Sequence, residues 1–271
     1  MGERNSRALL AGLGIVAAGP LLFLLICPHR ADCLRAIGHV GVWLGGGAKV
    51  GAVMLGASLL AWVARLVWLL RADAGLVRTL PRSHRLPSEL QAALRSTAMP
   101  RVSCVVSELP IAFCAGALRP VVIVSDGLVK HLRHAELQAV LVHEHEHARR
   151  REPLRRAASR AAADVLFYAP VARWWSRRMN VRSELQADRA AMMKVGRGAV
   201  AGALIALGSR SGPMDRAAFA GIAELRVAQI LGDELPPQAP KLSVLGATWL
   251  GVYLAFVATC CVVGMVLTLA R

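Results

Sequence analysis

The sequence predicts a mostly α-helical membrane protein in which an α+β domain lies between transmembrane helices. Of its 271 residues, 55% are hydrophobic and the mean hydropathy is +0.47, which is more apolar than an ordinary soluble domain. Long apolar stretches lie near both ends, and most of the charged residues lie in the region 71–242 between them. Short runs rich in β-branched residues inside that region add the β component.

Three segments are predicted to cross the membrane. Residues 8–27 carry no charge and are about long enough for a bilayer core of ~30 Å. A cleaved signal peptide is the alternative for this segment, although no small-residue cleavage site follows it. The second span covers 50–70, with Arg65 placed to reach the headgroups, and the third lies in 243–271. The apolar stretch 37–49 leaves open whether it also enters the membrane.

The charge distribution places the central domain in the cytoplasm. Residues 71–241 contain 26 Lys and Arg against 15 Asp and Glu, and basic residues directly follow the second span. The expected location is therefore the cell membrane, multi-pass, with lipid contacts at the basic flanks. The net charge of +16 does not indicate direct nucleic-acid binding, because it is spread over loops and no base-reading motif accompanies it.

Within the central domain, strands are predicted first and helices afterwards. Strands are expected in 101–108 and 112–128, which combine β-branched residues with Pro and Gly. Apolar residues at helical spacing predict these further helices: 135–152, 158–166, 181–208 and 216–231. The segment 165–175, "VLFYAPVARWW", is apolar with tryptophans at its end and is expected to contact the membrane interface.

The stretch "LVHEHEHARRREP" contains one frame of the zinc motif His-Glu-x-x-His. His143 and His147 are one helical turn apart, with Glu144 beside the first as the base that activates the attacking water. His145 has no partner at this spacing, so it and Glu146 are expected to point elsewhere. The alternative is a solvated, charged helix surface without a metal.

A third ligand is predicted in "SELQADRAA". Glu184 and Asp188 share a helix face, so Glu184 can complete the zinc site while Asp188 holds a ligating histidine by its other nitrogen. Three protein ligands leave one position open, as in catalytic zinc sites, with one zinc per chain. The alternative is that both acids are surface charges paired with Arg182 and Arg189.

These motifs resemble the membrane metallopeptidases of the β-lactam-sensing antirepressor type. The resemblance rests on "SELPIAFCAGALRPVVIVSDGLVKHLRHAELQAVLVHEHEHARRREPL", "VLFYAPVARWWSRRMNVRSELQADRAA" and "ELRVAQILG", in that order. More distantly, the chain is similar to heat-shock membrane zinc proteases and CAAX-processing proteases. The resemblance implies a gluzincin-like cytosolic domain whose zinc is bound by His143, His147 and Glu184. Glu144 would be the base, and Asp188 would hold one of the ligands without binding the zinc itself.

The resemblance also implies a substrate-binding strand and reveals one departure. The strand around Ala112, Phe113, Cys114, Ala115 and Gly116 is expected to lie at the cleft edge and pair with an extended substrate. The antirepressor sensors carry an extracellular penicillin-binding domain after the last span, which is not expected here because the sequence ends at Arg271.

The group that stabilises the oxyanion is left open by the sequence. Many zinc proteases use Tyr or His for this role. Tyr168 is the tyrosine outside the predicted spans, but its place in the apolar segment 165–175 favours a packing role over a catalytic one. Arg182 and Arg189, near the third ligand, are the other candidates.

The leading hypothesis is a membrane-anchored zinc endopeptidase that cuts a cytosolic protein or peptide, such as a DNA-binding transcriptional repressor, in regulated signalling. A quality-control protease for membrane proteins is one alternative, and a non-catalytic zinc-bearing membrane scaffold is another. The presence of the base Glu144 argues against the scaffold. The substrate, the activating signal and the oligomeric state do not follow from the sequence.

Overall fold

The computed structural model describes residues 40–83, 85–97, 102–208, 213–233 and 239–269. The chain divides into two compact units, one of residues 1–60 and 246–271 and the other of residues 61–245. The predicted span 8–27 lies outside the described residues. All features of the candidate site belong to the second unit.

Two helices are long and apolar enough to cross a membrane. They are α3 (Val40–Thr79) and α11 (Leu242–Leu269), whose qualifying stretches are Lys49–Thr79 and Leu242–Cys260. The predicted span 50–70 lies inside α3, and the predicted span in 243–271 lies largely inside α11. Almost none of the residues in the most apolar windows of these stretches are buried within the protein, as expected of lipid-facing helices.

A three-stranded sheet forms the β part of the second unit. It consists of β1 (Val102–Val105), β2 (Ala112–Ala115) and β3 (Val121–Ser125), in the order β1-β3-β2. β3 is parallel to β1 and antiparallel to β2. Its Val122, Ile123 and Val124 are buried, as their place in the central strand requires. β2 has no strand partner on its other side in the part of the chain that the structure describes.

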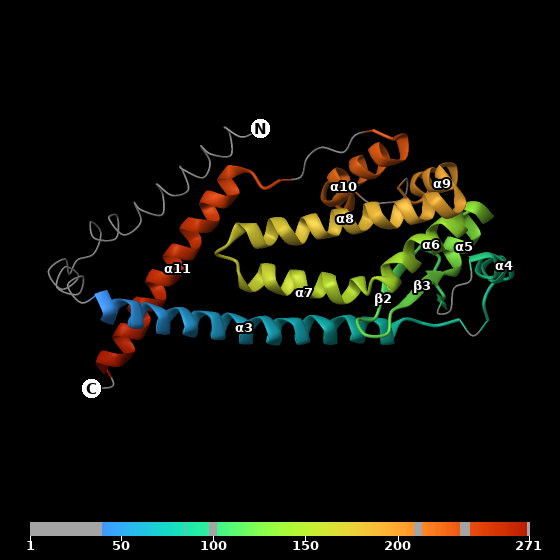
Figure 1. Ribbon diagram of the computed structural model, residues 1–271. Coiled ribbons are helices and arrows are strands. Elements are labelled where there is room, and N and C mark those ends of the chain that lie inside the picture. Colours follow the sequence, from blue (N-terminus) through green and yellow to red (C-terminus); the bar gives the residue numbers. More distant parts are fainter. Residues whose placement is uncertain (1–39, 84, 98–101, 209–212, 234–238, 270–271) are drawn as a thin grey trace. The chain divides into compact units, whose positions relative to one another are not determined.

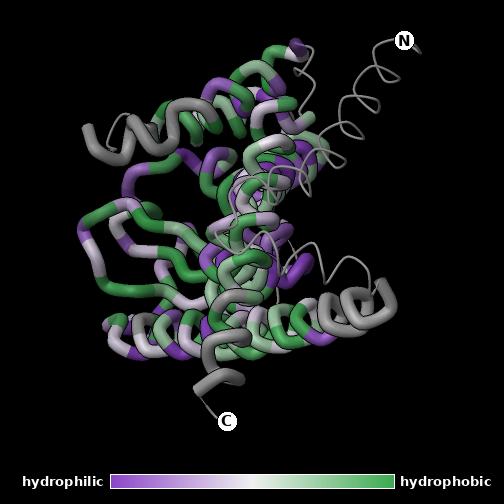
Figure 2. Tube along the Cα trace, turned by 90° about the vertical axis from the view of Figure 1, so that its left-hand side faces the viewer, coloured by the Kyte–Doolittle hydropathy of each residue, from purple (hydrophilic) through white to green (hydrophobic). Residues whose placement is uncertain are grey.

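Helices make up the rest of the second unit. They are α4 (Ser88–Thr97), α5 (Asp126–His131), α6 (His134–Arg149), α7 (Glu152–Val165), α8 (Pro170–Val195), α9 (Arg197–Gly208) and α10 (Pro213–Leu231). α6 lies at the centre, between the sheet and α8 and α9, and its Leu137 and Leu141 are buried in the main core. Hydrophilic and hydrophobic residues are interleaved along the helices (Figure 2).

Three helix boundaries differ from the sequence prediction. The predicted helix 181–208 is two helices, because Gly196 with φ +90° ends α8 and lets the chain change direction. The predicted helix 158–166 begins earlier, since Pro153 lies in the first turn of α7, where its missing N–H costs nothing. The predicted helix 135–152 is too long at its end: α6 ends at Arg149, and Glu152 already belongs to α7.

α7 and α8 form a long antiparallel hairpin beside the site (Figure 1). The turn that joins them, residues 166–169, lies at the opposite end of the hairpin from the sheet. α7 also packs against α3, where Leu69 forms a small cluster with Ala157 and Ala161. The hairpin therefore connects the metal-binding residues to a helix of membrane-spanning length.

Candidate metal centre

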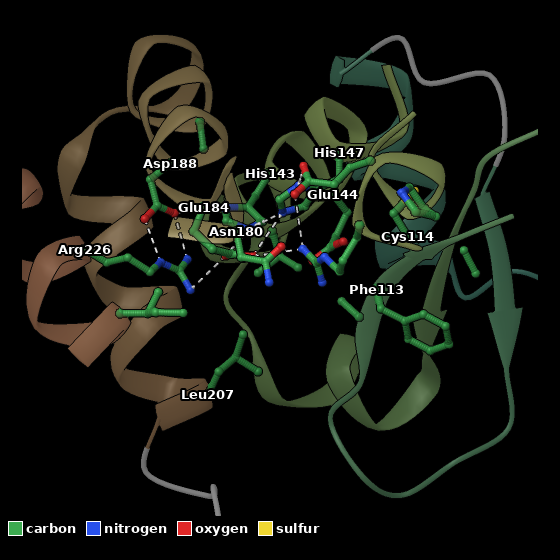
Figure 3. A pocket seen from close by; sticks show the side chains of 18 of the residues that line it. Phe113, Cys114, His143, Glu144, His147, Asn180, Glu184, Asp188, Leu207 and Arg226 are labelled. Atoms are coloured by element: carbon green, nitrogen blue, oxygen red, sulfur yellow. Dashed lines mark hydrogen bonds and ion pairs between the residues drawn. The ribbon is translucent and has the colours of Figure 1, made fainter. Parts of the chain in front are cut away.

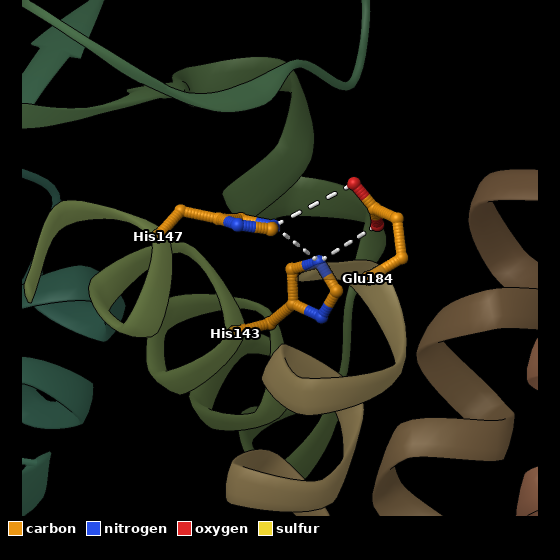
Figure 4. A group of neighbouring side chains, drawn as sticks. All are labelled: His143, His147 and Glu184. Atoms are coloured by element: carbon orange, nitrogen blue, oxygen red, sulfur yellow. Dashed lines mark hydrogen bonds and ion pairs between the residues drawn. The ribbon is translucent and has the colours of Figure 1, made fainter. Parts of the chain in front are cut away.

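α6 carries the two histidines of the zinc motif on one face. The Nε2 atoms of His143 and His147 lie 3.1 Å apart, and the rings meet edge to face (Figure 4). The helix is fixed at its start by Glu136, whose carboxylate accepts a hydrogen bond from the Arg133 backbone N–H at 2.9 Å. Both imidazoles are buried, and they point away from α6 toward Glu184 on α8.

Glu184 on α8 completes a group of three possible ligands. Its carboxylate oxygens lie 3.3 Å from Nε2 of His143 and 3.7 Å from Nε2 of His147. Two ligands of a tetrahedral zinc, each about 2.1 Å from the metal, are separated by about 3.4 Å, so this spacing fits a zinc ion. Two imidazoles and one carboxylate also form a donor set that zinc prefers. These residues can therefore hold one zinc with a position left open.

Asp188 contacts His143 at the ring nitrogen that does not face Glu184. Nδ1 of His143 lies 2.9 Å from a carboxylate oxygen of Asp188, which has no exposed surface. Arg226 on α10 donates two hydrogen bonds of 2.7 Å to the same carboxylate and lies 3.6 Å from Glu184. Asp188 thus pairs with Arg226 and His143, whereas Arg189 is exposed and forms no ion pair with it.

His147 is held in the same way by Glu152, which the sequence analysis did not identify. A carboxylate oxygen of Glu152 lies 2.7 Å from Nδ1 of His147, and its other oxygen lies 3.3 Å from Arg156. Arg151, with φ +50°, turns the chain so that the first residue of α7 returns to α6. No motif spacing reveals this contact, because it depends on the conformation of a single turn.

The charged groups around the histidines shift one another's pKa values. Burial alone would lower the pKa of His143, but its hydrogen bonds to Asp188 and Glu184 outweigh burial and raise it to about 9. Burial opposes ionisation of Glu184 as well, yet the hydrogen bond with His143 brings its pKa down to about 2. The pKa of Asp188 is lowered despite its burial by the same histidine and Arg226. Without metal, the site is therefore a network of paired charges.

The other residues of the His-Glu-His-Glu-His stretch point in different directions, as the helical spacing predicts. Glu144 lines the cavity in front of the histidines, and burial raises its pKa. Glu146 is ion-paired with Arg149 and Arg150. His145 is not among the cavity-lining residues.

A cavity of about 1020 Å³ lies in front of these side chains, with the metal-binding group in its wall (Figure 3). The predicted substrate strand borders it along Ala112, Phe113, Cys114, Ala115 and Gly116. Gly116 has φ +92°, and a Cβ there would approach the Arg119 carbonyl oxygen to 2.7 Å, so this end of the strand requires glycine.

The sequence-derived candidates for oxyanion stabilisation do not line this cavity. Arg182 and Arg189 are exposed elsewhere on α8, and Tyr168 lies in the turn between α7 and α8, packed edge to face on Phe167. The described cations that do line it come from α7 and α10: Arg156, Arg160 and Arg226. Asn180, one turn before Glu184 on α8, also lines the cavity.

The chain is similar to a known protein family and to a curated protease. The profile of a protein family described as BlaR1 peptidase M56 matches residues 50–215, which is more than half of the chain. The Protease HtpX homolog of Moorella thermoacetica is 32% identical over 148 residues, covering 54% of this chain and 49% of that protein. The chain thus spans about half the length of the curated relative that it matches. The family match includes α6, α7 and α8, which together carry the described metal-binding group.

Proposed function

The chain belongs to the BlaR1 peptidase M56 family, and on this premise we propose that it is a membrane-anchored zinc endopeptidase that cleaves a cytosolic protein. The observation that carries the proposal is the cluster of His143, His147 and Glu184, with Glu144 beside it in the same cavity. A purely structural zinc site would close all four positions with protein ligands, whereas this group supplies three. The open side of the cluster faces the cavity.

His143, His147 and Glu184 would hold the zinc. When bound, zinc would polarise the scissile carbonyl and favour ionisation of a water at neutral pH. Glu144 accepts the proton of the attacking water and delivers it to the departing amine. Asp188 and Glu152 each accept an Nδ1–H from one ligating histidine, which keeps the Nε2 lone pairs directed at the ion.

Substrate is proposed to bind along β2. One edge of β2 pairs with β3, and its residues 112–116 border the cavity. An extended peptide can pair with the other edge through backbone hydrogen bonds, which would lay its chain across the metal-binding group. Such binding favours an unfolded or loop segment over a helical one.

Arg156 is proposed as the cation nearest the reacting carbonyl. Its guanidinium lies 3.4 Å from Glu184 and is 49% exposed. Arg226, in contrast, already donates two hydrogen bonds to Asp188. Arg156 makes its long contacts with Glu152 and Glu184 through one nitrogen, Nη2, so its other donors are left for a developing oxyanion.

A transcriptional repressor is the proposed substrate, on the basis of the resemblance to antirepressor sensors. The second candidate is a protease of broader membrane-protein substrates, which the similarity to the Protease HtpX homolog favours. The two candidates predict different numbers of cleaved proteins, one or a few in the first case and many in the second.

The test compares new protein N-termini in cells that produce the wild type or the Glu144→Gln variant. We expect termini that appear only with the wild type, and their number decides between the two candidates. Glu146→Gln is the matched control, because this neighbour is engaged by two arginines away from the cavity. Identical termini with wild type and Glu144→Gln, in cells where both proteins bind zinc, would contradict the peptidase.

A further inference from the structure

We propose that the tip of the α7–α8 hairpin, residues 165–178, docks on an anionic membrane surface. This contact is separate from the peptidase chemistry and from the helices of membrane-spanning length. It gives the domain a second attachment to the lipid, at the end of the hairpin far from the sheet (Figure 1). Three features of the tip lead to it.

The first feature is a group of exposed aromatic side chains. Phe167 is 67% exposed and Trp175 is 51% exposed. Tyr168 packs edge to face on Phe167, with ring centroids 5.5 Å apart. Tyrosine and tryptophan are enriched where one end of a side chain meets lipid and the other meets water. Such exposure is unfavourable in water and favourable at a bilayer surface.

The second feature is an unbalanced positive charge. Residues 165–183 contain four arginines and neither Asp nor Glu. Arg173 and Arg177 are exposed and form no ion pair with any residue that the structure describes. Arg178 lies over the ring of Trp174, 5.7 Å from its centroid. Arginines near a cytoplasmic leaflet are attracted by anionic lipid headgroups, and their stems can lie along the apolar boundary.

The third feature is the position of the tip relative to α3. Within the long apolar stretch of α3, the Trp62 indole N–H donates to the Ala158 carbonyl at 3.1 Å, and Arg65 forms an ion pair with Asp164 at 2.8 Å. α7 therefore ends beside a part of α3 that is apolar enough to lie in the membrane. The tip, which follows Asp164 directly, thus lies beside the apolar stretch of α3, within reach of a bilayer that α3 would cross.

The contact between α3 and α7 also engages the acid that lies nearest to the tip. Asp164, the acid nearest to the tip along the chain, is engaged by Arg65 of α3. Glu184, the next acid on the far side, is occupied in the metal-binding group. Arg173 and Arg177 thus have no acid partner from their own hairpin, and lipid phosphate and anionic headgroups can supply the missing negative charge.

The test measures contact with lipid by tryptophan quenching in the full chain. The zinc-loaded protein is reconstituted in nanodiscs of phosphatidylcholine with about 30% phosphatidylglycerol, with or without bromine on the acyl chains. One variant, Phe167→Trp, adds a tryptophan at the tip. The matched control, Met193→Trp, adds one at the other end of α8, where Met193 is 82% exposed. The native tryptophans contribute the same background to both.

We expect brominated lipid to quench at least half of the emission added by Phe167→Trp and little of that added by Met193→Trp. Equal quenching of the two added tryptophans overturns the proposal. Equal protection of both from bromine overturns it as well.

A second pair of measurements tests the anionic character of the surface. In the Phe167→Trp protein, replacing both Arg173 and Arg177 by Glu, or omitting phosphatidylglycerol, is expected to lower the quenching at least twofold. Unchanged quenching in both cases overturns the role of anionic lipid. Retained zinc content and circular dichroism show that the variants are folded. The outcome does not depend on whether the protein cleaves peptides.

Discussion

Charged side chains are paired at one end of the α7–α8 hairpin, whereas two arginines at the other end are exposed without acid partners in the part of the chain that the structure describes. At the sheet end, Asp188 is matched by Arg226, and Glu152 by Arg156. At the tip, Arg173 and Arg177 are exposed, and no acid lies within residues 165–183. Paired charges behind the histidines fix ligand geometry, whereas unpaired ones at the tip are available to an external partner. Substitutions of charged residues should therefore be costly at the sheet end and mild at the tip.

The largest expected effect comes from Glu144→Gln. Removal of the proposed base should lower kcat/KM for a cleaved peptide by about 10²- to 10⁴-fold, with zinc content unchanged. Steady-state kinetics and metal analysis of the purified protein measure both. Glu146→Gln, which leaves the cavity untouched, should keep the activity. A Glu144→Gln protein that cleaves at the wild-type rate would refute the assigned role.

Asp188→Asn should produce the next largest effect, on zinc affinity. Loss of the charge behind His143 should weaken zinc binding by about 10- to 100-fold, because the histidine loses its orienting partner and Arg226 is left beside a neutral amide. Competition with a chelator of known affinity measures the change. An unchanged affinity would show that Asp188 does not orient the ligand.

Glu152→Gln should weaken zinc binding less, by about 10-fold. Glu152 plays the corresponding role for His147, but its arginine partner is 49% exposed and makes a single long contact of 3.3 Å. Solvent can replace this contact more easily than the two short hydrogen bonds that Arg226 gives Asp188. The same chelator competition compares the two variants.

Arg177→Gln at the tip is the control for both zinc-binding predictions, and it should leave zinc affinity unchanged. If Glu152→Gln costs as much as Asp188→Asn, the two histidines are held equally. If Arg177→Gln also weakens zinc binding, the contrast between the ends of the hairpin fails.

The smallest expected effect concerns Glu136 at the start of α6. Its pKa is lowered, chiefly by the hydrogen bond from the Arg133 side chain, so its contribution to stability is present above its unfolded pKa and is lost as pH falls through the folded one. Glu136→Gln should therefore lower the unfolding free energy by about 1 kcal/mol at neutral pH. Thermal unfolding in detergent should show this difference shrinking below about pH 4. A difference that persists in acid would assign the loss to packing.

The histidine spacing and the Glu184–Asp188 turn could be predicted from the sequence because each lies within one helix, where 3.6 residues per turn fixes which side chains share a face. The structure brings these four side chains together with Glu144 at the cavity. The broad order of strands followed by helices was predictable for the same local reason. The roles of the individual residues remain predictions until variants are measured.

Contacts that depend on tertiary structure could not be predicted. Glu152 reaches His147 only because Arg151 adopts a left-handed conformation, which is rare for a residue other than glycine. Arg226 lies far along the chain on α10 and meets Asp188 only when α10 packs on α8. The arginines near the third ligand in sequence, Arg182 and Arg189, point away from the cavity because helix periodicity places them on another face.

α7 forms a mechanical link between α3 and the candidate metal centre, which its sequence alone does not suggest. The helix has 14 residues and is therefore about 21 Å long. It contacts α3 at its middle through Trp62 and near its C-terminal end through Arg65, and it begins with the carboxylate that holds His147. A continuous helix transmits a push or a tilt with little loss along its length. A displacement of α3 would thus be transmitted along α7 to His147 of the candidate metal centre.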